Sequence, residues 1–188
     1  MKKILTIFFV VVFAVALIAL PACSKKTTDK PIVEKHDTET PTEDSYFIFK
    51  ALADDTYQIA PIDSQLPARL VIPSTHSVEE TQDGQTVEVL KAVSTIKDHA
   101  FKNVKSLEVV IIPENVTTIS VSAFYGCENI TEVSIPRSIT KISYISFYGC
   151  SKLTDVYYNG TVKQWKALST EGAFSSAPTV HCTDGDVK

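Results

Sequence analysis

Three successive stretches of the sequence repeat one pattern: VSTIKDHAFKNVKSLEVVIIP at residues 93–113, VTTISVSAFYGCENITEVSIP at 116–136 and ITKISYISFYGCSKLTDVYYN at 139–159. Each stretch begins 23 residues after the one before it, so apolar residues recur in register. A fixed period of this length is the signature of a solenoid, in which one structural unit stacks on the next. The recurring residues are Ile96, Ile119 and Ile142; Phe101, Phe124 and Phe147; Leu107, Ile130 and Leu153; and Val110, Val133 and Val156.

The end of each repeat predicts a short strand. Val133 and Ile135 alternate with polar residues, which places their side chains on one face of an extended chain. Pro136 ends that strand because proline has no N–H to donate to a neighbouring strand. A second apolar group is expected on the return side of the coil, and no single repeat can bury both groups. We therefore expect stacked coils with parallel strands around a continuous core. The second group comprises Ile119, Ala123 and Phe124.

The repeat resembles a known family of sequences. Its pattern, Ile-x-x-x-Ala-Phe-x-Gly-Cys-x-x-Leu-x-x-Val-x-Ile-Pro, is similar to the BspA-like class of bacterial leucine-rich repeats over about residues 70–160. Residues 158–161, 164–165 and 179–185 also resemble the closing unit of such proteins. The resemblance implies a mainly β, curved solenoid, a surface or secreted location, and a role in adhesion or protein recognition. The first repeat departs from the pattern, with Lys102-Asn103-Val104 at the Gly-Cys step, and the array is short.

Both ends of the solenoid need a cover, because an open coil exposes strand edges and core. Residues 46–92 are expected to form the N-terminal cap, followed by the repeats at 93–160. Within this cap, Asp83-Gly84 between valine-rich segments predicts a β-hairpin. Pro73 and Pro113 are 40 residues apart, 17 more than one repeat, so the hairpin is interpreted as an insertion in a degenerate first repeat. Further strands are expected at residues 46–49, 57–59 and 70–73.

Residues 161–188 are expected to form the C-terminal cap. Thr161 is suited to cap a short helix over residues 162–168, whose Trp165 and Leu168 would pack on the last coil. A final strand is expected at residues 178–182. From Gly185 onward we expect the chain to fray.

The first 45 residues predict export and anchoring. A cationic start and an apolar run at residues 4–20 precede Pro21-Ala22-Cys23, which resembles a lipoprotein signal although Pro21 is unusual there. Residues 1–22 would be the signal peptide and Cys23 the lipidated first residue of a polar tether ending at residue 45. Such a polar segment buries too little apolar surface to fold, so we expect it to be disordered. A retained transmembrane helix is the alternative, because the run is about long enough to span a bilayer.

Charge and motifs argue against several functions. The 22 acidic residues outnumber the 18 Lys and Arg residues, two of which lie in the leader, and no basic cluster occurs. Nucleic acid is therefore not an expected partner. No metal-binding or nucleophile motif appears, so we expect neither an enzyme nor a cofactor. The four histidines, His36, His76, His99 and His181, are scattered, and His181 and Cys182 point to opposite faces of a strand.

The remaining cysteines allow two interpretations. Cys127 and Cys150 lie one repeat apart and therefore in adjacent coils, which is within reach of a disulfide. A repeated cysteine is more commonly a small buried residue, and we favour that interpretation. A bond from Cys182 to Cys150 through the cap is a further alternative.

The strands offer a candidate ligand-binding face, on the concave side of the solenoid. Ile111 and Tyr157 are larger and more apolar than a solvated face requires, and tyrosine is favoured at interfaces. The same side chains could equally shield neighbouring coils, and shielding is the favoured interpretation for Tyr125 and Tyr148 at the turn. The outward positions form two columns across the coils: Val109, Glu132 and Asp155, and beside them Ile111, Ser134 and Tyr157.

These observations together predict a non-enzymatic lipoprotein of the cell envelope. A lipid anchor on Cys23 would attach it to the membrane. A protein or glycan ligand would bind the two columns, where the acidic Glu132 and Asp155 would tolerate a basic patch on the ligand. Ser24 provides no aspartate-type retention signal, which favours the outer membrane or cell surface. The alternative is a periplasm-facing structural or assembly lipoprotein without an external ligand.

Overall fold

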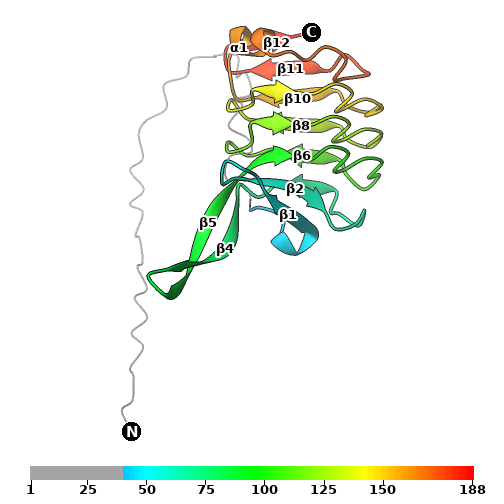
Figure 1. The fold of residues 1–188 in the computed structure, drawn as a ribbon. Coiled ribbons are helices and arrows are strands. Elements are labelled where there is room, and N and C mark those ends of the chain that lie inside the picture. Colours follow the sequence, from blue (N-terminus) through cyan, green and yellow to red (C-terminus); the bar gives the residue numbers. More distant parts are fainter. Residues whose placement is uncertain (1–39) are drawn as a thin grey trace, which may run out of the picture. The chain divides into compact units, whose positions relative to one another are not determined.

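The computed structural model describes residues 40–188, and the expected signal peptide and Cys23 lie outside the described residues. The described chain folds as the predicted β-solenoid of stacked coils (Figure 1). Among these residues no helix is long and apolar enough to cross a bilayer.

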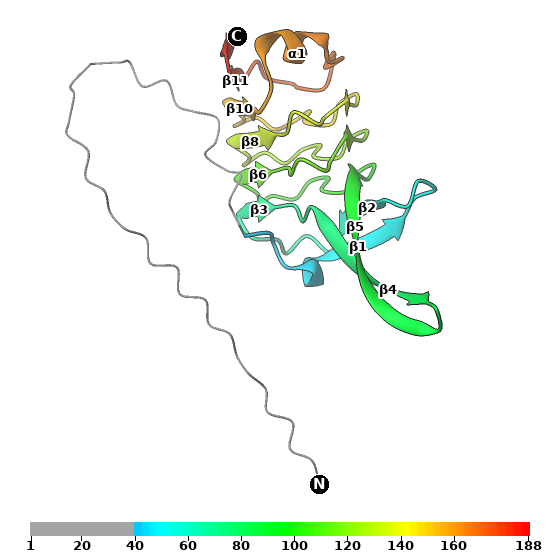
Figure 2. The same ribbon diagram turned by 90° about the vertical axis from the view of Figure 1, so that its left-hand side faces the viewer.

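One sheet runs along the stack and contains the strand that ends each repeat (Figure 2). Neighbouring strands of this sheet pair in parallel, as the repeat predicts, except that the last strand pairs antiparallel with the strand before it. In spatial order the strands are β3 (Arg69–Val71), β6 (Val109–Ile111), β8 (Glu132–Ile135), β10 (Asp155–Tyr158), β11 (Thr179–Cys182) and β12 (Gly185–Val187).

A second sheet forms the return side of the coils. Ile59, Ile96, Ile119 and Ile142 pair directly with one another across it, which explains why isoleucine recurs at this step of the repeat. In spatial order its strands are β1 (Phe47–Ala51), β2 (Tyr57–Pro61), β5 (Gln85–Ile96), β7 (Thr118–Ile119) and β9 (Lys141–Ile142), with β4 (Thr75–Gln82) paired to β5.

The core between the sheets contains a stack of phenylalanine rings. The ring centroids of Phe101 and Phe124 are 4.9 Å apart, those of Phe124 and Phe147 are 5.1 Å apart, and those of Phe147 and Phe174 are 5.2 Å apart. Phe174 follows Phe147 by 27 residues, so a further coil with four extra residues continues the array. The fixed period of 23 did not reveal that coil.

Threonine side chains tie each coil to the one before it. The Thr117 hydroxyl donates to the Ser94 carbonyl, and the Thr140 hydroxyl donates to the Thr117 carbonyl. On the other sheet the Thr131 hydroxyl donates to the Glu108 carbonyl, and Thr154 repeats the contact to Thr131. Each coil therefore uses the residues of the same repeat positions to bind its neighbour.

Two columns of residues adopt left-handed backbone. Asn103, Gly126 and Gly149 have φ of 62°, 70° and 81°, so asparagine, which tolerates this conformation, occupies the glycine position in the departing first repeat. In the second column, His99, Ser122 and Ile145 have φ of 57°, 55° and 50°. Ile145 is the strained member, because a β-branched side chain disfavours positive φ.

Replacing Ile145 with asparagine is expected to raise the free energy of unfolding by about 1 kcal/mol, because backbone strain of this kind costs on the order of 1–3 kcal/mol. The melting temperature should rise by about 2–4 °C for a chain of this size, measured by circular dichroism. His99→Asn, at the equivalent but exposed position of the first repeat, is the control and should change it less. A lower melting temperature for Ile145→Asn would show that packing of the isoleucine outweighs the strain.

The N-terminal cap contains the predicted hairpin. Asp83 and Gly84 both have positive φ, as the tight turn between β4 and β5 requires. The hairpin forms a two-stranded arm that projects beyond the coils (Figures 1 and 2). The expected tether was wrong for residues 40–45, where the Thr42 N–H donates to the Val71 carbonyl and the turn η2 (Asp44–Tyr46) follows. The Val71 N–H in turn donates to the Thr42 hydroxyl. Thr42 therefore supplies hydrogen-bond partners to the otherwise open edge of β3.

The C-terminal cap contains the predicted helix, α1 (Val162–Ala167). The Thr161 side chain caps it by accepting a hydrogen bond from the Gln164 backbone N–H. In return, the Gln164 side chain accepts one from the Thr161 backbone N–H. Trp165 is buried against Tyr158, as expected. The expectation that the chain frays from Gly185 was wrong: β12 pairs with β11, and this pairing covers an edge that would otherwise be open.

Cys127 and Cys150 are free buried thiols, which confirms the favoured interpretation. Their Sγ atoms donate to the carbonyls of Phe101 and Phe124, at 2.9 and 3.3 Å. Burial raises the pKa of both thiols to about 12, so both stay protonated and unreactive near neutral pH.

Candidate functional site

The strand register forms the two predicted columns and extends each at both ends. The first column contains Arg69, Val109, Glu132, Asp155 and Thr179. The second column contains Val71, Ile111, Ser134, Tyr157 and His181. The added residues are not multiples of 23 residues away from the predicted ones, so the repeat count alone could not find them.

The second column is less accessible than expected. Ile111 and Ser134 are only 5% and 4% exposed, whereas Val109, Glu132, Asp155 and Tyr157 are partly exposed. The reason is the short distance between neighbouring strands, which packs each side chain against those of the adjacent coils. Ile111 and Ser134 contribute instead to the floor of a surface hollow.

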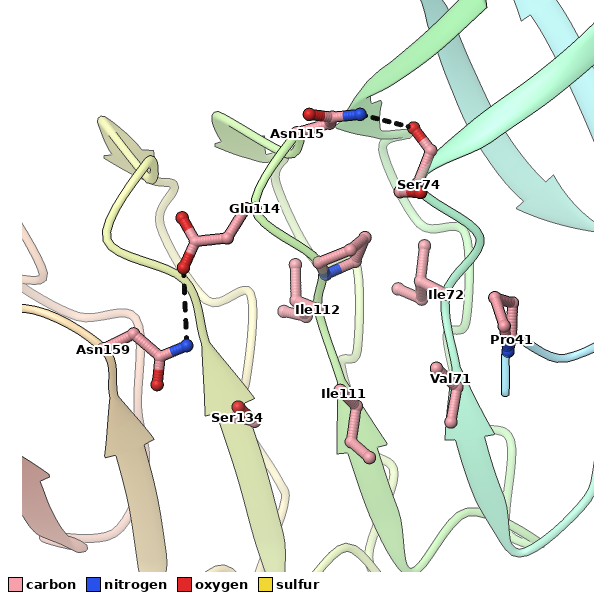
Figure 3. A pocket seen from close by; sticks show the side chains of 11 residues that line it. Pro41, Val71, Ile72, Ser74, Ile111, Ile112, Glu114, Asn115, Ser134 and Asn159 are labelled. Carbon is pink, nitrogen blue, oxygen red and sulfur yellow. Dashed lines mark hydrogen bonds between the residues drawn. The ribbon is translucent and has the colours of Figure 1, made fainter. Parts of the chain in front are cut away.

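This hollow, called here the strand-end hollow, has a volume of about 430 Å³ and lies where β3, β6 and β8 end (Figure 3). Its floor is aliphatic, whereas its rim carries polar groups. At the rim, the Asn115 amide donates to the Ser74 carbonyl at 3.1 Å, and the Asn159 amide donates to Glu114 Oε1 at 3.4 Å (Figure 3). The lining residues are Pro41, Val71, Ile72, Ser74, Ile111, Ile112, Pro113, Glu114, Asn115, Ser134 and Asn159.

The other end of the same face carries a histidine between two carboxylates. His181 Nε2 lies 2.8 Å from Asp155 Oδ1, and Nδ1 lies 3.2 Å from Asp186 Oδ1. A carboxylate only accepts hydrogen bonds, so both contacts form when the imidazole carries both protons. The ring also stacks on Tyr157, with centroids 4.9 Å apart. The hydrogen bond from His181 lowers the pKa of Asp155 below its usual value.

The Asp155→Asn variant should lose less folding stability than the unaltered protein as the pH falls through the acid range. The lowered pKa means that ionised Asp155 contributes stability above the ordinary aspartate pKa of about 3.9, and this contribution is lost as pH falls through the lower folded value. Because the carboxylate is 35% exposed, we expect less than about 1 kcal/mol. Melting temperatures across the acid range would measure it, with Glu171→Gln as the control. An identical acid slope in the Asp155 variant would contradict this expectation.

Tyr157 lies in an acidic environment. Burial raises the pKa of its hydroxyl, and the charges of Glu132 and Asp155 raise it further. At the turn, Tyr125 and Tyr148 stack with centroids 5.9 Å apart, and the Lys102 ammonium lies 5.4 Å from the Tyr125 centroid. This second aromatic pair lies off the strand columns. Within residues 40–188 no group of three or more His, Cys, Asp or Glu side chains could hold a metal ion.

The family model described as BspA type leucine rich repeat region (6 copies) matches residues 76–178. The chain belongs to the BspA-type leucine-rich repeat family. Leucine-rich repeat proteins of this kind are generally scaffolds for protein–protein interaction. No curated protein matches the sequence.

Solved structures of bacterial leucine-rich repeat proteins resemble this BspA-type chain. A leucine rich cell surface protein from Faecalibacterium prausnitzii is 30% identical, with a TM-score of 0.48 over 65% of this chain and 33% of its own. A leucine-rich repeat protein of T. pallidum is 20% identical, with a TM-score of 0.52 over 76% of this chain and 64% of its own. A leucine-rich repeat protein from Bacteroides ovatus is 18% identical, with a TM-score of 0.45 over 73% of this chain and 36% of its own. The chain thus spans between one third and two thirds of the length of these structures.

Proposed function

We propose that this protein is a lipid-anchored, non-enzymatic surface protein that binds a partner protein through the two columns and the strand-end hollow. The observation that carries the proposal is the hollow itself, in which largely buried aliphatic residues form a floor that includes Ser134. Tyr157 is the register partner of Ser134, and Glu132 lies two residues before Ser134 on the same strand. Apolar surface in a concave site with a few polar groups at its rim is the usual composition of a binding site. A scaffold of stacked strands keeps these side chains in fixed positions.

The anchoring part of the proposal rests on the sequence. The apolar run, followed by Ala22-Cys23 and a polar stretch, supports lipidation at Cys23 and removal of residues 1–22. At least two acyl chains are needed for stable attachment, because one chain gives only marginal binding. The cell surface description of the Faecalibacterium prausnitzii protein supports the same location for this chain.

Protease treatment of intact cells tests the location. If the folded part faces outward, an added protease should remove it while a periplasmic control protein stays intact. If the folded part is protected until the envelope is opened, the surface proposal fails, and a periplasm-facing structural or assembly role takes its place.

Site-specific photo-crosslinking tests the binding face. A photoreactive phenylalanine analogue at Tyr157 should capture a discrete partner in intact cells, whereas the same analogue at Glu171, outside the sheet, should not. Equal capture from both positions, or none from Tyr157, would show that the strand face is not the binding surface.

A further inference from the structure

We propose that the strand-end hollow receives an aliphatic side chain from a basic peptide segment of the partner, with Lys or Arg of that segment contacting Glu132. This inference rests on the proposed function, because it names the chemistry of the ligand bound by the same face.

The aliphatic requirement follows from the floor of the hollow. Val71, Ile111 and Ile112 present hydrocarbon to a space of about 430 Å³, which lies within the usual range for ligand sites. Binding is favoured when an apolar group displaces water from such an apolar surface. Pro41 and Pro113 form part of the wall without adding charge. An aliphatic side chain is the group that this lining accommodates best.

The basic requirement follows from Glu132. Its register partner on the neighbouring strand is Asp155, and like charges directly opposite each other destabilise a sheet. Asp155 already has His181 as a hydrogen-bond partner at 2.8 Å, whereas among the ion pairs within residues 40–188 none includes Glu132. A cation brought by a partner would relieve this repulsion. Arg69, the basic member of the first column, lies on β3, two strands away from Glu132.

Glu114 adds a second carboxylate at the rim. Its contact with the Asn159 amide, at 3.4 Å, is long for a hydrogen bond. A cation also acts in this region, since Arg137, one repeat later, lowers the pKa of Tyr158 whereas Glu114 raises it. Glu132 is therefore the main carboxylate of the proposal and Glu114 the secondary one.

The spacing favours a peptide over a small amine. Ser134 in the floor and Glu132 are two residues apart on β8, which corresponds to about 6.6 Å along a strand. Alternate side chains of an extended peptide have the same spacing. A segment with lysine two residues from leucine could therefore contact Glu132 and fill the hollow at the same time.

Fluorescence anisotropy with labelled peptides tests this chemistry on the full chain in a non-ionic detergent. The probes are GKSLSKG, its acidic counterpart GESLSEG, and GKSSSKG, which lacks the leucine. We expect GKSLSKG to bind at least about tenfold more tightly than either counterpart, because each loses one of the two contacts. Equal binding of the three peptides would overturn the proposal.

Variants then assign the contacts. Glu132→Lys should weaken GKSLSKG binding about tenfold, and Ser134→Phe should do the same by filling the hollow. Glu171→Lys makes the same charge change outside the sheet and is the matched control. Circular dichroism melting checks folding, and Glu132→Gln, a milder change, keeps the charge test valid if either variant fails to fold. Full binding by folded Glu132→Lys and Glu132→Gln would overturn the proposal.

Two further outcomes separate this inference from the proposed function. If hexylamine competes as strongly as GKSLSKG, the hollow takes a small amine and the peptide proposal fails. If the Tyr157 crosslinker captures a partner while GKSLSKG shows no preference, the binding face stands and only its basic-aliphatic specificity is wrong.

Discussion

Replacing Phe124 by alanine is expected to lower the free energy of unfolding by about 3–5 kcal/mol, the range for removing a large buried aromatic side chain. Phe124 is fully buried and stacks on Phe101 on one side and on Phe147 on the other. Its loss would leave a cavity in the middle of the ring stack, where the rigid coils on both sides can close only partly. The melting temperature should fall by roughly 6–20 °C for a chain of this size.

Thermal and urea denaturation would measure this effect. Tyr148→Ala is the control, because Tyr148 also stacks on an equivalent aromatic residue but is 47% exposed. The control should cost about 1 kcal/mol or less. A similar loss for both variants would show that stacking rather than core burial determines the stability.

Replacing Gly149 by valine is expected to cost about 2–5 kcal/mol through two effects. Its φ of 81° is disfavoured for any residue with a Cβ, and most of all for a β-branched one. A Cβ at this position would also lie 3.1 Å from the Gly126 Cα and 3.2 Å from the Gly126 nitrogen, which is backbone that cannot swing aside. The Gly126 N–H donates to the Tyr148 carbonyl, so a shift would disturb the hydrogen bond between two coils.

Gly84→Val separates the two effects. Gly84 has a similar φ of 78°, but no atom lies within 4 Å of a Cβ built there. The hairpin variant should therefore show the conformational cost alone, and Gly149→Val should lose more stability in the same denaturation experiment. Equal losses would mean that the close approach of the two glycines does not contribute.

The sequence predicted the parts of the fold that depend on strict repetition. Val110, Val133 and Val156 are one period apart, and they pair across neighbouring strands as expected. Phe174 continues the core but follows four extra residues, which breaks the period while leaving the stacking geometry intact. The pairing of β12 was missed because only three residues form it and their sequence carries no alternating pattern.

The strand positions of the candidate site residues were predicted in part. The positions of Glu132 and Tyr157 in the columns follow from the period alone. The low exposure of Ile111 and Ser134 does not, because it depends on packing between neighbouring coils and on segments distant in sequence. His181 reaches Asp155 only after the irregular last coil, so counting residues could not bring them together.

The repeated threonine contacts have a consequence for how such proteins change length. Because each coil binds its neighbour through the same repeat positions, a coil meets an equivalent surface above and below. An in-frame duplication of residues 114–136 would insert one whole coil without creating an unmatched surface. Duplication or deletion of one repeat can therefore lengthen or shorten the candidate binding face by one coil. Each step adds or removes one residue of each column, while both ends keep their caps.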